Sequence, residues 1–120
     1  MYTPRPISDH PRYCQLSKLL DNARKRSKGK SRKCTLDDDW KRWALTQDAC
    51  PLTGLKLDWS ARRSREAPGP LAPSIDRIEP SIGYTPENTR IVSHFANIAK
   101  SVWTDTEFKL LVLASARNIE

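Results

Sequence analysis

Apolar residues recur at helical spacing in two stretches of the N-terminal half of the chain. The first stretch predicts an amphipathic helix over residues 12–28, with an apolar stripe of Leu16, Leu19, Leu20 and Ala23. The second predicts a helix from residue 36 to about residue 47, with a stripe of Leu36, Trp40, Trp43 and Ala44. Both tryptophans lie on the second stripe, so they are expected in the core.

Capping patterns predict where two helices begin. Thr35, followed by an acidic first turn, predicts the start of the second helix. Thr104 and Glu107 form a full capping box, and Trp103 and Phe108 have the spacing of a hydrophobic staple. The resulting C-terminal helix is expected to reach about Arg117, with Leu110, Leu111, Leu113 and Ala114 as core candidates.

Between these helices, the pattern changes to short β-branched runs. It predicts a strand within residues 73–80, a turn-rich loop, a second strand over 89–93 and a helix over 94–100. Upstream, residues 55–59 predict a short strand and residues 60–73 an exposed loop. The fold class expected from this order is a small α+β domain.

The charge balance of the chain indicates what kind of partner it binds. The 120 residues include 21 Lys and Arg against 14 Asp and Glu, a net charge of +7. Such a balance favours an anionic polymer, because clustered cations neutralise phosphates and release counterions. It does not distinguish DNA from RNA. The candidate phosphate-binding residues are Arg24, Lys25, Arg26, Lys28, Lys30, Arg32, Lys33, Arg62, Arg63, Arg65 and Arg90.

The remaining composition favours a soluble protein of the cytoplasm. No apolar run approaches the roughly 20 residues that a membrane span needs, and the Pro-interrupted residues 1–11, which predict an extended tail, show no signal peptide. The three cysteines, Cys14, Cys34 and Cys50, are not closely paired, so free thiols in a reducing compartment are expected.

The segment 73–100 resembles a known nuclease motif. Ser-Ile-Asp-Arg-Ile, Gly-Tyr-Thr-Pro-Glu-Asn, Arg-Ile-Val and Ala-Asn-Ile-Ala-Lys follow one another there, and Cys-Pro-Leu-Thr-Gly lies upstream at residues 50–54. This arrangement resembles the HNH (ββα-metal) endonucleases, in a phage and prophage branch with Asp-Arg in place of Asp-His. It is distantly similar to the phage recombination endonuclease VII type. The likeness covers roughly residues 12–110, so residues 12–120 are expected to form one such domain with its ββα-metal core at 73–101.

The resemblance implies a divalent-metal site. By matching positions, Asp76 on the first strand and Asn97 on the helix are the metal ligands, and Asn88 braces the loop between the strands. Oxygen ligands of this kind suit one Mg²⁺ or Mn²⁺ per site, which takes further oxygens from water and the substrate phosphate.

Arg77 departs from the family pattern, because it occupies the position of the general-base histidine. An arginine stays protonated, so it cannot ordinarily accept a proton from water, although it can clamp a phosphate. His94, one helical turn before Asn97, is the nearest candidate base, and Tyr84 is a weaker one. Two further alternatives stay open. A metal-bound hydroxide could act without a side-chain base, or the site could be inactive and only bind nucleic acid.

The family's structural zinc site is not expected here. Many HNH domains hold four cysteines in two C-x-x-C pairs. The matching positions in this chain are Cys50, Thr53, Ser93 and Ala96, and one cysteine cannot make a structural zinc site. Apolar packing is expected to replace the zinc, using Leu52, Leu55, Ile91, Phe95 and Trp103.

The function expected from the resemblance is divalent-metal-dependent hydrolysis of DNA phosphodiester bonds, in duplex or branched DNA. The principal alternative is a catalytically inactive module on the same fold that binds DNA or a protein, such as a phage regulator or inhibitor. A weaker alternative is an RNA-binding adaptor that stacks bases on Trp40 and Trp43, which requires both to be exposed. The sequence does not indicate the oligomeric state.

Overall fold

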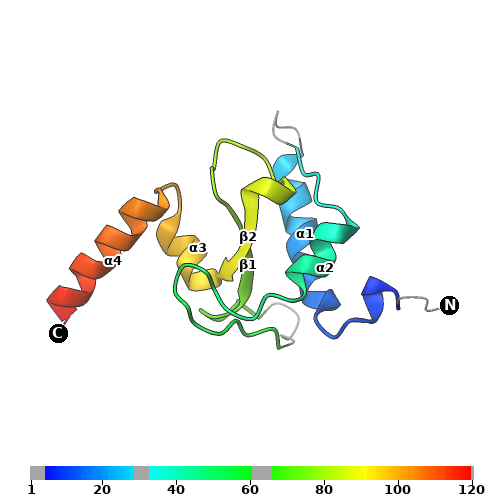
Figure 1. The fold of residues 1–120 in the computed structure, drawn as a ribbon, viewed down its shortest axis with the longest axis horizontal. Helices are drawn as coiled ribbons and strands as arrows, with labels where there is room; N and C mark the ends of the chain where they lie inside the picture. The colour runs from blue at the N-terminus through cyan, green and yellow to red at the C-terminus, as the bar shows by residue number, and fades with distance from the viewer. Residues whose placement is uncertain (1–4, 29–32, 61–65, 120) are drawn as a thin grey trace.

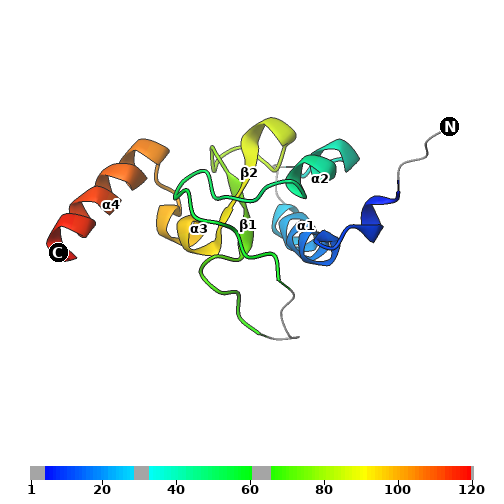
Figure 2. The ribbon, with the colours of Figure 1, turned by 60° about the horizontal axis from the view of Figure 1, so that its bottom comes forward.

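The computed structural model describes residues 5–28, 33–60 and 66–119. This part of the chain is an α+β fold of four α-helices and one two-stranded antiparallel sheet. Figures 1 and 2 show α1 and α2 on one side of the β-hairpin and α3 on the other, with α4 beyond α3. The elements are α1 (Tyr13–Ser27), α2 (Asp38–Ala44), β1 (Pro73–Arg77), β2 (Thr89–Ser93), α3 (His94–Lys100) and α4 (Asp105–Ile119).

The β-hairpin and α3 form the centre of the molecule. Ile75 on β1 pairs with Ile91 on β2, and Asp76 pairs with Arg90. Ile75, Ile91 and the neighbouring Val92 are buried in the core. Helix α3 follows β2 without a linker, because Ser93 ends the strand and caps the helix by accepting a hydrogen bond from the Ala96 N–H at 3.1 Å. The strand–loop–strand–helix order predicted for residues 73–100 is confirmed.

Helix α1 covers one side of the hairpin. Leu16, Leu20 and Ala23 are buried on one stripe, as the periodicity predicts, and the helix packs against β1. Three basic residues lie in its last turn, where cations suit the helix dipole.

The short N-terminal segment departs from the predicted extended tail, because Ile7–Asp9 form one turn of 3-10 helix.

Helix α2 begins later than predicted and buries only one of its tryptophans. The N-cap is Asp37 rather than Thr35, because the Asp37 carboxylate accepts a hydrogen bond from the Trp40 N–H at 2.9 Å. Trp40 is buried, but Trp43 is 41% exposed, so the prediction of two core tryptophans is half wrong. The helix is only two turns long, and its buried stripe ends with Trp40 and Ala44.

The strand predicted over residues 55–59 is absent from the described structure. Lys56 makes an isolated bridge with Ala49, and no neighbouring strand extends it into a ladder. The apolar residues nonetheless pack inward, with Leu57 and Trp59 buried. The Trp59 indole donates a hydrogen bond to the Gln47 carbonyl at 2.8 Å, which fixes this segment beside the end of α2.

The C-terminal helix has the predicted cap but not the predicted core. Thr104 Oγ1 accepts from the Glu107 N–H at 3.1 Å, and the Thr104 N–H donates to the Glu107 carboxylate at 3.3 Å, completing the capping box. Phe108 is buried, whereas the four core candidates Leu110, Leu111, Leu113 and Ala114 are all exposed. The apolar stripe predicted the helix correctly and its burial wrongly.

Across the described residues, no helix is both long and apolar enough to cross a membrane.

Candidate active site

Two adjoining hollows bring together residues of α1, β1 and α3. One, of about 270 Å³, is lined by Arg26, Ile75, Asp76, Arg77, Pro80, Tyr84, Asn97 and Ser101. The other, of about 250 Å³, shares Arg26, Ile75, Tyr84 and Asn97 with it and adds His94. Asp76 and Asn97, which lie 21 positions apart in the sequence, therefore face one space. We call this pair of hollows the hairpin cleft.

Asp76 lies at the base of the hairpin cleft and is held by two cations. Its Oδ2 accepts a hydrogen bond from Nε of Arg90 at 2.8 Å. Lys100 Nζ lies 3.4 Å from Oδ1 and 3.5 Å from Oδ2. Asp76 and Lys100 are both buried, with 4% and 0% of their side chains exposed. The candidate metal ligand is therefore also part of a buried ion-pair network.

Arg90 joins Asp76 to the start of α4, which corrects its prediction as a phosphate-binding residue. Its two terminal nitrogens donate to the two carboxylate oxygens of Asp105 at 2.7 and 2.9 Å. These hydrogen bonds hold the pKa of Asp105 below its ordinary value and raise the pKa of Arg90. With both ends of the guanidinium engaged by carboxylates, Arg90 has a structural role.

Lys100 and Asp105 complete this network, and sequence reasoning assigned neither of them a role. Besides Asp76, the Lys100 ammonium group lies 3.8 Å from Asp105 and 3.4 Å from the carbonyl oxygens of Arg77 and Ile78. The lysine was part of the Ala-Asn-Ile-Ala-Lys motif, but nothing in the sequence indicates that it points inward. Its position three residues after Asn97 placed it one turn further along the same helix.

Asn97 is oriented by hydrogen bonds on its amide nitrogen. Nδ2 donates to Ser74 Oγ at 2.6 Å and to the Ile75 carbonyl at 3.4 Å. The carboxamide oxygen, the only atom of this group that can ligate a cation, receives no hydrogen bond from the described residues. Ser74 is thus a positioning residue for Asn97 that the sequence did not reveal.

The donor set in the hairpin cleft fits a hard divalent cation with few protein ligands. Asp76 offers a carboxylate whose contacts with Lys100 are long, and Asn97 offers its free amide oxygen. Within the described ranges, no three His, Cys, Asp or Glu side chains are grouped as a metal site. Two protein oxygens, supplemented by water and a substrate phosphate, match the usual Mg²⁺ arrangement rather than an all-protein cage.

Arg77 projects beside Tyr84 at the mouth of the hairpin cleft. Its guanidinium carbon lies 5.0 Å from the centroid of the Tyr84 ring, a cation–π distance. Tyr84 is buried, so it offers the arginine a fixed face. Arg26 of α1 lines both hollows. Two guanidinium groups therefore border the space that Asp76 and Asn97 face.

Asn88 makes the loop-bracing contacts expected of it. Its Oδ1 accepts from the Glu79 N–H at 2.9 Å. Its Nδ2 donates to the carbonyl oxygens of Glu79, Ile82 and Gly83 at 3.1, 3.4 and 3.0 Å. The side chain is buried and does not line the hairpin cleft, so its contribution is to hold the connection between β1 and β2 in one shape.

His94 lines the second hollow together with Asn97, as the one-turn spacing predicts. It does not line the hollow that contains Asp76 and Arg77. Its position at the first residue of α3 is fixed by the backbone, since its N–H donates to the Ala72 carbonyl at 2.8 Å. His94 is therefore at the edge of the cleft, beside Asn97 and across from α1.

The basic residues of α1 lie next to the hairpin cleft. Arg24, Lys25 and Arg26 are exposed in the last turn of α1, followed by exposed Lys28 and Lys33. Arg24 lies 3.8 Å from Asp21, a surface contact that leaves it largely in solvent. The other predicted phosphate contacts, at Lys30, Arg32, Arg62, Arg63 and Arg65, lie outside the described residues.

Hydrogen bonds link the four positions matched to the family's zinc ligands, Cys50 to Thr53 and Ser93, and Ser93 to Ala96. Burial alone would raise the pKa of the Cys50 thiol, but hydrogen bonds from the Thr53 side chain and the Ser93 N–H outweigh it and lower that pKa. Ser93 in turn accepts from the Ala96 N–H. Cys50, Ser93 and Ala96 are fully buried. Of the apolar residues expected to replace the metal, Ile91 is buried and Leu52 packs partly buried against the core, as predicted. Leu55, Phe95 and Trp103 are about half exposed, which corrects that part of the prediction.

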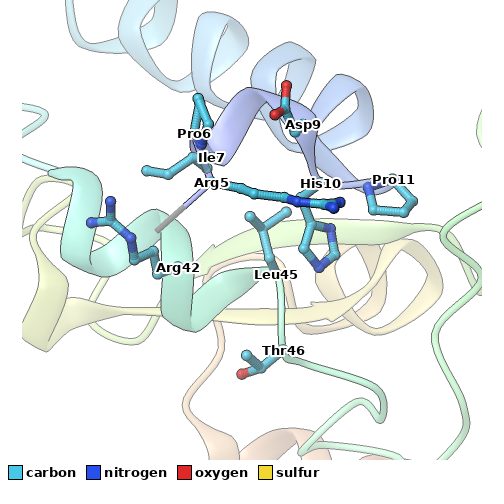
Figure 3. A pocket seen from close by; sticks show the side chains of 9 residues that line it. All are labelled: Arg5, Pro6, Ile7, Asp9, His10, Pro11, Arg42, Leu45 and Thr46. Atoms are coloured by element: carbon cyan, nitrogen blue, oxygen red, sulfur yellow. The ribbon is translucent and has the colours of Figure 1, made fainter. Parts of the chain in front are cut away.

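A separate hollow lies between the N-terminal segment and α2, far from these residues. Figure 3 shows it, with a volume of about 320 Å³. Its floor is apolar at Ile7 and Leu45, and its rim carries Arg5, His10 and Arg42. None of the candidate catalytic residues lines it.

No family model, curated protein or solved structure matches this chain. A proposal of function must therefore come from the side chains of the hairpin cleft and from the chemistry that they can perform.

Proposed function

We propose that the chain is a divalent-metal-dependent endonuclease of the HNH (ββα-metal) type that hydrolyses DNA phosphodiester bonds. The observation that carries the proposal is the shared cleft of Asp76 and Asn97. One carboxylate and one amide oxygen, delivered by adjacent elements, face a space bordered by two arginines. Hydrolysis of a phosphodiester is favoured by this combination of ligands for a Lewis-acidic metal and cations that bind the phosphate.

The arrangement around the hairpin cleft supports the proposed fold type. The hairpin and the following helix have the expected order, and Asn88 holds the intervening loop by four hydrogen bonds. The meeting of Cys50, Thr53 and Ser93 adds independent support, because these positions were matched to a zinc site by sequence alone. Under this proposal, hydrogen bonds and close packing would take the place of the zinc.

Each residue of the cleft has a role in the proposed reaction. Asp76 and Asn97 would hold the metal, which when bound supplies Lewis acidity toward the phosphate and its leaving oxygen. Arg77 and Arg26, which line the same hollow, would clamp the non-bridging oxygens of the phosphate, a task that suits the planar guanidinium group. Ser74 keeps the amide nitrogen of Asn97 occupied, so that its oxygen faces the cleft.

The general base is proposed to be His94, with Tyr84 less suited. Arg77 cannot take the proton. His94 lines the hollow next to Asn97 and is half-buried, so a water on the phosphate can reach it from that side. Tyr84 already packs its ring against Arg77 and is buried.

DNA, duplex or branched, is the proposed partner. The exposed cations at the end of α1 continue the positive border of the cleft away from Arg26. Backbone phosphates on either side of the scissile bond would lie along this surface, giving salt-sensitive binding.

The proposal is tested by incubating the full chain with supercoiled plasmid and with a four-way DNA junction, in Mg²⁺, in Mn²⁺ and in EDTA. Nicked or linear products that require the metal support it. Binding of either DNA without any product in either metal would contradict it.

A second function, a DNA-binding module without catalysis, is favoured by one observation. Asp76 already has Arg90 and Lys100 as partners, which would make it a structural carboxylate in a cleft where Arg77 replaces the usual base. In that case the cleft would bind a phosphate through Arg26 and Arg77 and leave it intact. Plasmid and junction cleavage separates the two functions directly.

A further inference from the structure

Helix α4 carries an apolar surface that the described chain leaves uncovered. The helix projects away from the rest of the molecule in both ribbon views (Figures 1 and 2). From residue 110 to residue 116 its sequence is Leu-Leu-Val-Leu-Ala-Ser-Ala, without a charge. Leu110, Leu111 and Leu113 are each more than half exposed, and Ile119 is 83% exposed. A helix that is apolar all round is normally buried.

A groove runs between this helix and α3. It has a volume of about 390 Å³. Phe95 and Ala99 of α3 form one wall, Trp103 lies in the connecting turn, and Leu111, Val112 and Ile119 form the other wall. Phe95, Trp103 and Leu111 are about half exposed, so large apolar surfaces face solvent from both sides of the groove.

We propose that this surface binds a second copy of the chain, with α3 and α4 of each copy packing against α3 and α4 of the other around a two-fold axis. The proposal concerns assembly and does not depend on the nuclease function. Three properties identify a second copy as the partner of this surface. They are the apolar residues on opposite faces of α4, the area of the exposed apolar side chains and the order of charges along the helix.

Apolar residues on opposite faces of α4 require a partner that surrounds it. Leu110 and Val112 lie about 160° apart around a helix of 3.6 residues per turn, and both are exposed. A flat partner would cover only one of them. A four-helix arrangement made from two copies encloses each α4 between its own α3 and the partner's helices.

The exposed patch has the area of a stable two-fold interface. Each copy offers eight large apolar side chains that are 43–83% exposed: Phe95, Val102, Trp103, Leu110, Leu111, Val112, Leu113 and Ile119. At roughly 100 Å² each, about half of a large side chain, they supply the roughly 800 Å² per partner of a standard interface. Isolated monomers rarely expose a patch beyond about 600 Å².

The sequence of α4 is also complementary to itself in the antiparallel direction. Asp105 in its first turn is already paired with Arg90 and Lys100, but Glu107 in the same turn is exposed, and Arg117 lies in its last turn. Antiparallel packing brings the acidic start of one helix toward the basic end of the other, and it opposes their dipoles favourably. Small residues on the groove face, Ser115 and Ala116, leave room for the partner's larger side chains.

The experiment is sedimentation equilibrium of the full chain over a range of concentrations, comparing the wild type with Leu111→Glu/Ile119→Glu. Both positions are exposed, so the variant should fold, which far-UV circular dichroism checks. Leu55→Glu is the matched control, since Leu55 is 53% exposed and lies outside the patch. We expect a two-chain species for the wild type and the control. For the double variant we expect the Kd of the dimer to rise at least about 100-fold.

A second variant, Ser115→Arg, fills the groove with a long, positively charged side chain. It should also sediment with the mass of a single chain. A wild type that stays a single chain at every concentration would overturn the proposal and leave the surface to a different partner. A two-chain wild type that neither variant dissociates would overturn it too, since the interface would then lie elsewhere. A mass that keeps rising with concentration would indicate open-ended association and contradict the two-fold dimer.

Discussion

Lys100 places its ammonium group 3.4 Å from Oδ1 of Asp76, with the lysine side chain fully buried. A buried cation is tolerated only with a charged partner and further hydrogen bonds. Here Asp76 supplies the charge, and the carbonyl oxygens of Arg77 and Ile78 supply the acceptors. Asp76 therefore stabilises the fold in addition to any role as a metal ligand, and loss of activity in an Asp76 variant would not by itself identify a catalytic residue.

Replacing Lys100 by methionine should destabilise the protein. The substitution keeps the volume but leaves Asp76 with Arg90 as its only cation among the described residues, so the free energy of unfolding should fall by about 2–4 kcal/mol. Lys109→Met is the matched control, because Lys109 is an exposed lysine of α4, and it should change stability by less than about 0.5 kcal/mol. Urea denaturation of both variants measures the difference. Equal stabilities would show that the Lys100–Asp76 contact is not a stabilising one.

The ion pair between Arg90 and Asp105 should make stability depend on pH in the acid range. Hydrogen bonds from Arg90 lower the folded-state pKa of Asp105, so its contribution is complete above the unfolded value of about 3.9. The contribution is lost as the pH falls through the lower folded value.

Asp105→Asn should accordingly lower the free energy of unfolding by about 1 kcal/mol at pH 7, a modest figure because the Asp105 side chain is 36% exposed. The gap between wild type and variant should begin to narrow near the unfolded value of about 3.9 and close once the pH is below the lowered folded-state pKa of Asp105. Thermal unfolding at a series of pH values measures it. A gap that persists unchanged at the lowest pH would mean that the effect of Asp105 is not ionic.

Local pattern predicted the elements of the fold better than their packing. The β-branched run at residues 89–93 and the helical pattern of residues 94–100 predicted β2 and α3 with the observed bounds. Residues 55–59 have the composition of a strand, but a strand also needs a partner, which a local pattern does not reveal. The apolar residues of α4 predicted burial, yet periodicity does not say which surface covers a helix.

The candidate site was predicted in part for a similar reason. Asp76 and Asn97 were found because the motif fixes their spacing, and the structure places them in one cleft. Lys100, Arg90 and Asp105 form their network through contacts between distant parts of the chain, and charge alone made Arg90 look like a phosphate contact. A basic residue in a sequence has no visible partner until the fold supplies one.

Gly83 is required where the hairpin loop meets the segment after α1. A Cβ at this position would overlap the backbone of Lys33, which itself accepts a hydrogen bond from the Tyr84 N–H at 2.9 Å. Gly83→Ala should therefore cost about 1–3 kcal/mol. Gly69→Ala is the control, because its Cβ would meet no atom within 4 Å, and it should be neutral or slightly stabilising. Chemical denaturation compares the two, and similar stabilities would contradict the close contact.

The cluster around Cys50 should bind zinc when the other three positions matched to the family's zinc ligands are changed to cysteine. In the variant Thr53→Cys/Ser93→Cys/Ala96→Cys, we expect the four thiolates to bind one Zn²⁺ tetrahedrally, because hydrogen bonds already link Cys50 to Thr53 and Ser93, and Ser93 to Ala96. Metal analysis and a zinc-dependent rise in Tm measure this. The same variant with Cys50→Ser is the control and should bind much more weakly. A folded triple-cysteine variant that binds no zinc would contradict the proposed match to the HNH fold.

The measurement that tests the central claim most directly is the rate of metal-dependent plasmid cleavage by wild type and Asn97→Ala. Asn97 is chosen because it lies outside the buried ion-pair network. Asn22→Ala is the matched control, because Asn22 is an exposed residue of α1 that lines the second hollow but not the one that contains Asp76. The account predicts cleavage by wild type and Asn22→Ala in Mg²⁺ or Mn²⁺, abolished by EDTA, and a rate at least about 100-fold lower in a folded Asn97→Ala. Cleavage that is unaffected by Asn97→Ala, or a wild type that binds DNA without cutting it, would contradict the account.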